Sequence, residues 1–172
     1  MRLPLVALAD KVRSSLWFIP AVMVLGGAVL SFVAVAADRR LIDAPGRSFF
    51  LYGGGAEGAR AVLGTVASSM MTVAGVVFSI TIVALTLASQ QFGPRVLRNF
   101  MEDRGNQIVL GTFITTFVYC LLVVRTVRGG DGDQFVPHIA VTGAVFLSIV
   151  SLGVLIYFIH HVSTSIRAET VI

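Results

Sequence analysis

The sequence predicts an all-α membrane protein with four transmembrane helices and one short amphipathic helix at the membrane interface. Two observations favour this fold class. The 172 residues are 56% hydrophobic and only 13% charged, whereas a soluble globular domain carries about 25% charged residues. Four apolar stretches also have about the length that a helix needs to cross a hydrocarbon core roughly 30 Å thick.

The four stretches are expected to span the membrane as parts of a single membrane domain, residues 1–172. They run over about 16–37, 61–89, 108–124 and 139–159 and contain no Asp, Glu, Lys or Arg. The first stretch follows basic residues, as the apolar region of a signal peptide does. Its apolar run is about twice as long as that region usually is, so we expect an uncleaved transmembrane helix. Four spans place both termini on one side. The basic residues divide seven to six between the sides, which weakly favours cytoplasmic termini.

Hydroxyl side chains recur on one side of the second span, in "TVASSMMTVAGVVFSITIVALTLASQQFGPR". Projected as a helix, eight small or polar residues of this span fall in a stripe about 120° wide, with Val76 and Val83 among them. This hydroxyl stripe consists of Thr65, Ser68, Ser69, Thr72, Gly75, Ser79, Thr86 and Gln90. Four of its members repeat every seven residues, and Thr81 is the one hydroxyl on the opposite side.

Two interpretations of the hydroxyl stripe stay open. Small and hydroxyl residues let membrane helices approach closely and form hydrogen bonds across their contact, and a seven-residue repeat favours left-handed packing. Alternatively, the stripe faces water or a permeating solute, and its oxygens replace part of the hydration shell. Both can hold if the second span surrounds an oligomer axis.

The other spans carry shorter patterns of the same kind. Gly27 and Ser31 are four residues apart, as are Gly111 and Thr115, and this spacing of small residues is typical of helix contacts in membranes. Further hydroxyl residues share one side of the third and fourth spans: Thr112, Thr115, Thr116, Tyr119, Ser148 and Ser151. We expect contacts within the helix bundle here.

A short amphipathic helix is expected over about 94–103, in "SQQFGPRVLRNFMEDRGNQ". Pro94 suits the first turn of a helix, and Gly93 permits the bend before it. Such a helix would lie in the membrane interface with Arg95 and Arg98 toward lipid phosphate groups.

No catalytic, metal or cofactor site is expected. The adjacent His160 and His161 point about 100° apart on a helix and cannot converge on one metal ion, and His138 stands alone in sequence. The single cysteine, Cys120, allows no intrachain disulfide. Basic residues are too sparse for nucleic-acid binding, and the spans hold no ionisable group for proton relay. We therefore expect a protein that is not an enzyme.

Two segments carry a family resemblance: "GGGAEGARAVLGTVASSMMTVAGVVFSITIVALTLASQQFGPRVLRNFMEDRGNQIVLGTFITTFVYCLLVVRTV" and "FVPHIAVTGAVFLSIVSLGVLIYFIHHVSTSI". The chain resembles the bacterial predicted membrane proteins known as domain of unknown function 2254, from the first span onward. The resemblance implies a four-helix region in a bacterial inner membrane and implies no activity. Members of that family continue into a sizeable C-terminal region outside the membrane, and this region is expected to be absent from a chain that ends at "SIRAETVI".

Two functional hypotheses follow from the sequence, and in both of them membrane lipids contact the protein. The first is an oligomeric channel or permease-like protein that uses the hydroxyl stripe as a pathway. The second is a structural or accessory subunit that packs through the stripe against a larger membrane complex. The sequence slightly favours the first and predicts either a homo-oligomer or other membrane subunits as partners.

Overall fold

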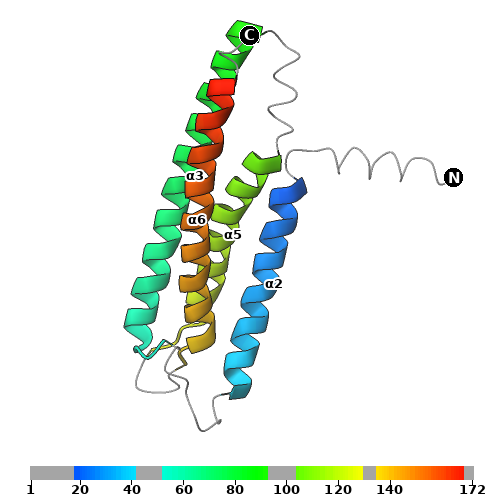
Figure 1. Cartoon of the computed structure of the whole chain (residues 1–172). Helices are drawn as coiled ribbons and strands as arrows, with labels where there is room; N and C mark the ends of the chain where they lie inside the picture. The colour runs from blue at the N-terminus through cyan, green and yellow to red at the C-terminus, as the bar shows by residue number, and fades with distance from the viewer. Residues whose placement is uncertain (1–17, 42–51, 93–103, 130–134, 169–172) are drawn as a thin grey trace, which may run out of the picture.

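The computed structural model describes residues 18–41, 52–92, 104–129 and 135–168. These residues hold four helices (Figure 1): α2 (Phe18–Leu41), α3 (Ala56–Phe92), α5 (Arg104–Val124) and α6 (His138–Ala168). Each contains a stretch long and apolar enough to cross a membrane: Phe18–Arg40, Ala56–Val83, Gly105–Val124 and His138–His160. The predicted all-α fold with four membrane-spanning helices is confirmed. The expected interfacial helix, residues 94–103, lies outside the described residues together with Arg95 and Arg98.

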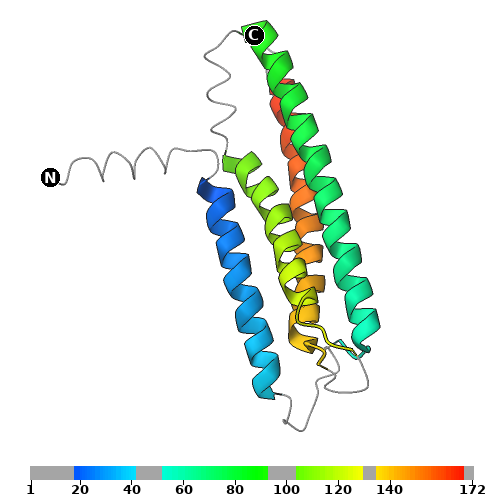
Figure 2. The ribbon, with the colours of Figure 1, turned by 180° about the vertical axis from the view of Figure 1, so that it is seen from behind.

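Helix α5 holds the bundle together. It packs against each of the other three helices, and α6 also contacts both α2 and α3. Figures 1 and 2 show α2 and α3 on opposite flanks of the bundle, with α5 and α6 between them. The last turns of α2 and α5 and the first turns of α3 and α6 therefore meet at one end, the lower end in Figure 1.

Two helices are longer than the membrane requires. Helices α3 and α6 have 37 and 31 residues, or about 55 Å and about 46 Å at 1.5 Å per residue, against a hydrocarbon core of roughly 30 Å. Both continue beyond their apolar stretches at the upper end in Figure 1. The sequence predicts that each span ends where its run of apolar residues ends. Because polar side chains do not end a helix, the helices run on.

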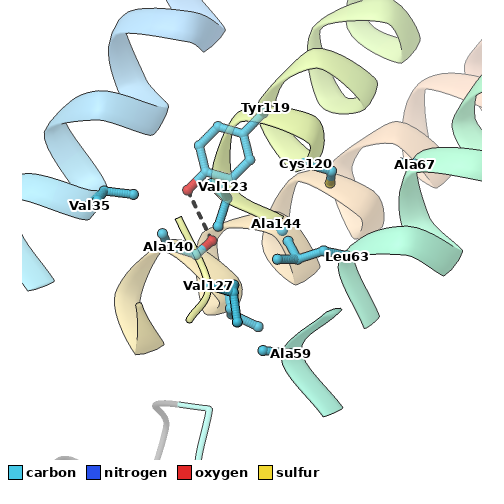
Figure 3. Packing of buried hydrophobic residues seen from close by; sticks show 11 residues of the cluster. Val35, Ala59, Leu63, Ala67, Tyr119, Cys120, Val123, Val127, Ala140 and Ala144 are labelled. Atoms are coloured by element: carbon cyan, nitrogen blue, oxygen red, sulfur yellow. Dashed lines mark hydrogen bonds between the residues drawn. The ribbon is translucent and has the colours of Figure 1, made fainter. Parts of the chain in front are cut away.

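The described core combines small side chains, mainly alanines and valines, with a few large ones such as Phe113 and Tyr119. The side of α3 that packs inward presents Ala59, Leu63, Ala67, Met70, Ala74 and Val77, all buried. Figure 3 shows the larger of two buried clusters, where Leu63 and Ala67 of α3 lie near Cys120 and Val123 of α5 and Ala144 of α6. Alanines at these positions bring helix backbones close, as van der Waals packing in lipid requires.

The contact between α2 and α5 depends on glycine. A β-carbon at Gly27 of α2 would clash with the Thr115 methyl group of α5. A β-carbon at Gly111 of α5 would lie 2.7 Å from the Met23 sulfur and 3.2 Å from the Pro20 Cα atom. The expectation that both glycines mark helix contacts within the bundle is confirmed.

Candidate functional site

The hydroxyl stripe lies on the outer side of α3, opposite the side that packs on α5 and α6. Seven of its eight members are exposed in the single chain: Thr65, Ser68, Ser69, Thr72, Gly75, Ser79 and Thr86. The eighth, Gln90, is in the last turns of α3, and its side chain is outside the described ones. The stripe therefore lines no pathway among the described residues of one chain, and it has no contact with the other three described helices.

Several stripe hydroxyls donate to the backbone of their own helix. Ser68 Oγ donates to the Thr65 carbonyl oxygen at 3.1 Å. Thr72 Oγ1 donates to the Ser68 carbonyl at 2.9 Å, and Thr86 Oγ1 donates to the Ile82 carbonyl at 2.9 Å. This local bonding is the usual way in which Ser and Thr satisfy their donor in a helix. It leaves the hydroxyl oxygens directed outward as acceptors.

Two glycines leave the outer side of α3 open. A β-carbon at Gly75, within the stripe, would meet no atom within 4 Å, and the same is true at Gly64, which borders the stripe. Glycine in a helix interior costs up to about 1 kcal/mol relative to alanine, and no neighbour within the described bundle accounts for that cost.

The other exposed helix surfaces have a different character. Helix α2 exposes Leu25 (66%) and Phe32 (66%), and α6 exposes Phe146 (64%) and Ile156 (70%). Such large apolar side chains suit contact with acyl chains. The stripe of α3 offers small groups and oxygens, with exposed Val76 (53%) and Val83 (58%) among them. Thr81, on the other side of α3, points into the bundle and donates to Asn106 Oδ1 of α5 at 3.1 Å.

A second polar centre, which the sequence did not reveal, joins α2 to α6 at the lower end of the bundle. Asp38 is only 7% exposed. Its Oδ1 accepts from the Ile139 amide and its Oδ2 from the Ala140 amide, both at 2.9 Å. These amides belong to the first turn of α6, where four N–H groups lack partners within the helix. The carboxylate also suits the positive end of the helix dipole.

The sequence explains why a distant residue caps α6. The residue before His138 is Pro137, which has no side-chain oxygen, whereas Ser, Thr, Asp or Asn at that position would bond the second or third amide. Asp38 supplies this function from α2. The signal available in the sequence was an uncapped helix start together with an acidic residue at the end of another span. Only the structure brings the two together.

The segment before α3 is tied to the same turn of α6. The Tyr52 amide donates to Thr142 Oγ1 at 3.0 Å, and the Tyr52 carbonyl contacts the His138 Nδ1 atom. The Thr142 hydroxyl in turn donates to the His138 carbonyl at 2.8 Å. His138 thus serves as a structural contact.

Two buried hydrogen bonds join α5 to α6. Thr116 Oγ1 and Ser151 Oγ lie 3.0 Å apart and are fully buried. The Tyr119 hydroxyl donates to the Ala140 carbonyl at 3.0 Å (Figure 3). It reaches this atom because residue 143 is glycine: a β-carbon there would lie 2.6 Å from the hydroxyl oxygen. The expected hydroxyl contacts of the third and fourth spans are confirmed for Thr116 and Ser151.

Within the described ranges, no group of three His, Cys, Asp or Glu residues is placed to hold a metal ion. Cys120 is a free thiol in the buried core. The chemistry that the described residues offer is therefore helix contact and acceptor oxygens along α3.

Comparison with known proteins gives a family match over most of the chain. The family model described as "Predicted membrane protein (DUF2254)" matches residues 13–172. Uncharacterised proteins of Mycobacterium bovis and Mycobacterium tuberculosis are each 39% identical over 170 residues, covering 96% of this chain and 32% of the relative. The chain thus spans about a third of the length of the curated relatives that it matches. No solved structure matches.

Proposed function

This chain belongs to the predicted membrane protein family DUF2254, and from that premise we propose that it is an oligomeric channel or permease-like protein of the bacterial inner membrane. In this proposal several copies place the outer side of α3 around a common axis, both termini are cytoplasmic, and the protein is not an enzyme. The observation that carries the proposal is the outward direction of the hydroxyl stripe. Small and hydroxyl residues are enriched where membrane helices contact one another, which favours a protein neighbour over lipid at this side of α3.

The bonding within the stripe suits a pathway for a neutral or cationic solute. Because Ser68, Thr72 and Thr86 donate to their own helix, their remaining lone pairs face outward. Oxygens of this kind replace part of a hydration shell in narrow pores. The seven-residue repeat through Thr65, Thr72, Ser79 and Thr86 places one such group at every second turn.

The same bonding supports a second candidate, an accessory subunit that docks through α3 on a different membrane protein. A hydroxyl whose donor is already satisfied can be packed dry at little cost. Gly64 and Gly75, which meet no neighbour in this chain, would allow a partner helix to approach closely. In this case the stripe is buried in protein and never meets water.

Cysteine accessibility separates the two candidates. Ser79→Cys is placed in a Cys120→Ala background, and the membrane-embedded protein is treated with a membrane-impermeant thiol reagent. The matched control is Phe78→Cys, the adjacent position, whose side chain is 51% exposed and lies about 100° around the helix from Ser79, outside the stripe. A water-filled pathway predicts labelling at residue 79 and protection at residue 78.

Crosslinking and mass measurement complete the test. In an oligomer with α3 at its axis, the Ser79→Cys protein forms disulfide-linked dimers upon mild oxidation, and the Phe78→Cys protein does not. Protection at residue 79 in a crosslinked oligomer would favour dry packing over conduction. A monomer that is protected at both positions and never crosslinks would contradict the channel proposal.

A further inference from the structure

Helix α3 continues at the upper end of the bundle well beyond the first residue of α5. The Thr81 Oγ1 and Asn106 Oδ1 atoms lie 3.1 Å apart, so these two residues stand at one height along the bundle. Helix α5 begins just above Asn106, at Arg104, whereas α3 runs past Thr81 to Phe92. At 1.5 Å per residue, α3 therefore ends about 13 Å above the start of α5. We refer to residues 82–92 as the α3 extension.

The α3 extension stands in water although it is mostly apolar. The apolar stretch of α5 begins at Gly105, so the upper edge of the hydrocarbon core lies near this residue. The extension above it reads "IVALTLASQQF" and contains no charged residue. At its base, the side chains of Ile82 and Val83 are 46% and 58% exposed. An apolar surface outside the membrane indicates a protein partner.

The side of α3 that packs inward lower down continues into the α3 extension. Its residues recur three or four positions apart as far as Val77 and Thr81, and the same helical period places residues 85, 88 and 92 on this side. In the sequence these are Leu85, Ala88 and Phe92. Figures 1 and 2 show the upper part of α6 beside α3, but α5 ends below it. For about two turns, the inward side of α3 therefore lacks the neighbour that α5 provides lower down.

The length of chain between α3 and α5 determines how it can join the two helices. Residues 93–103 lie outside the described residues and have to descend the same distance, about 13 Å. A helix over residues 94–103 that lay flat in the membrane interface would use nearly all of them without descending, and the links outside it would span about 10 Å at most. A helix antiparallel to α3 descends about 14 Å by itself. The described ends of α3 and α5 thus favour the second arrangement.

We propose that residues 94–103 dock as a helix on the inward side of the α3 extension, above α5 and in line with it. The apolar residues of this segment share one side of such a helix: Val96, Leu97, Phe100 and Met101. That side covers the inward side of the α3 extension. Arg95 and Arg98, on the other side, then face water above the membrane and do not lie along lipid phosphate groups.

Disulfide formation within one chain tests the docking. The heights derived above bring Phe100 opposite Leu85, and Leu97 opposite Ala88. Two variants of the full chain carry Cys120→Ala, one with Leu85→Cys and Phe100→Cys, the other with Ala88→Cys and Leu97→Cys. Upon mild oxidation in the membrane, both are expected to lose their free thiols within the monomer, because a disulfide needs Cα atoms about 4.4–6.8 Å apart. Alkylation followed by mass spectrometry counts the thiols that remain.

The matched control combines Thr86→Cys with Phe100→Cys in the same background. Thr86 is adjacent to Leu85 but lies about 100° around the helix, exposed on the hydroxyl stripe, so the control is expected to keep its thiols. Free thiols in both test variants, or a control that crosslinks as readily, would overturn the inference. Disulfide-linked dimers in place of the intramolecular bond would overturn it as well and would identify a second copy as the occupant.

Thermal unfolding in detergent, followed by circular dichroism, tests the docking without cysteines. Phe100→Ala is expected to lower the unfolding midpoint by several degrees, because a large apolar side chain of the contact is lost. Asn99→Ala, on the polar side of the segment, is expected to leave the midpoint unchanged. A midpoint for Phe100→Ala equal to that of the wild type would contradict the docking. The hydroxyl stripe lies on the other side of α3, so neither result decides whether the protein is a channel.

Discussion

The contact between α2 and α5 and the outer side of α3 are built from the same kinds of residue, yet the structure uses them differently. Gly27 has the Thr115 methyl group against it, whereas Gly75 has no neighbour within 4 Å of a β-carbon. Both lie in apolar helices among small residues, so a sequence pattern alone does not distinguish them. The comparison teaches that a small-residue pattern indicates a helix contact, and that only the packing shows whether the partner is in the same chain.

The hydroxyl groups repeat this contrast. Thr116 and Ser151 are fully buried and lie 3.0 Å apart between α5 and α6, and each also donates to a carbonyl of its own helix, Thr112 and Leu147 respectively. Ser68 and Thr72 are exposed and bond to their own backbone. All four hydroxyls thus donate to their own helix, and the difference is burial. The buried pair joins two helices of one bundle, while the exposed hydroxyls remain open to a partner that the described bundle does not supply. Four predictions test the contrast, in order of decreasing effect.

The largest effect is expected from Gly27→Leu. The new side chain would be driven into Thr115, and because both backbones are held in helices, α2 must move away from α5. Overpacking of this kind costs about 3 kcal/mol at a tightly filled site. Thermal unfolding in detergent, followed by circular dichroism, measures the loss. The control is Gly26→Leu, since a β-carbon at that neighbouring position meets nothing within 4 Å; equal destabilisation by both variants would refute the contact.

Asp38→Ala is expected to cost about 2 kcal/mol, because hydrogen bonds to a charged group contribute about 1.5–3 kcal/mol and two α6 amides lose their acceptor. Asp38→Asn keeps one acceptor oxygen and should lose roughly half as much. The same unfolding experiment measures the loss of stability in both variants. The control is Arg40→Ala, which alters an exposed residue of the same helical turn. If the alanine variant were as stable as the wild type, capping of α6 from α2 would be wrong.

The hydrogen bond between Thr116 and Ser151 should contribute a smaller amount. Hydrogen bonds between membrane helices average about 0.6 kcal/mol in double-mutant cycles. The cycle combines Thr116→Val, Ser151→Ala and the double variant, and its coupling energy is the quantity to compare. A coupling energy indistinguishable from zero would show that the two hydroxyls are adjacent without stabilising each other.

The smallest effect on folding is expected from Gly75→Leu, within about 0.5 kcal/mol, as for substitutions of surface residues without contacts. The same variant should reduce self-association, since a large side chain would keep a second helix away from the stripe. Thermal unfolding measures the change in fold stability, and disulfide crosslinking through Ser79→Cys measures the change in self-association. A loss of fold stability comparable to that of Gly27→Leu would erase the difference between the two regions.

Much of the fold could be read from the sequence because hydropathy and helical period are local properties. The four spans are confirmed, as are the contacts of Gly27 and Gly111, and Thr81 contacts Asn106 of α5. The burial of Asp38 could not be predicted. It stands next to two arginines at the end of an apolar run, and in sequence it has the character of a solvated flanking residue.

By itself the sequence determined that four helices cross the membrane and that one of them carries its oxygens along a single side. Tertiary structure alone decided that this side faces out of the bundle and that Asp38 caps a helix a hundred residues away. The physical reason is that a helix's own period orders residues around its axis, whereas the order in which helices pack determines which side meets protein and which meets lipid.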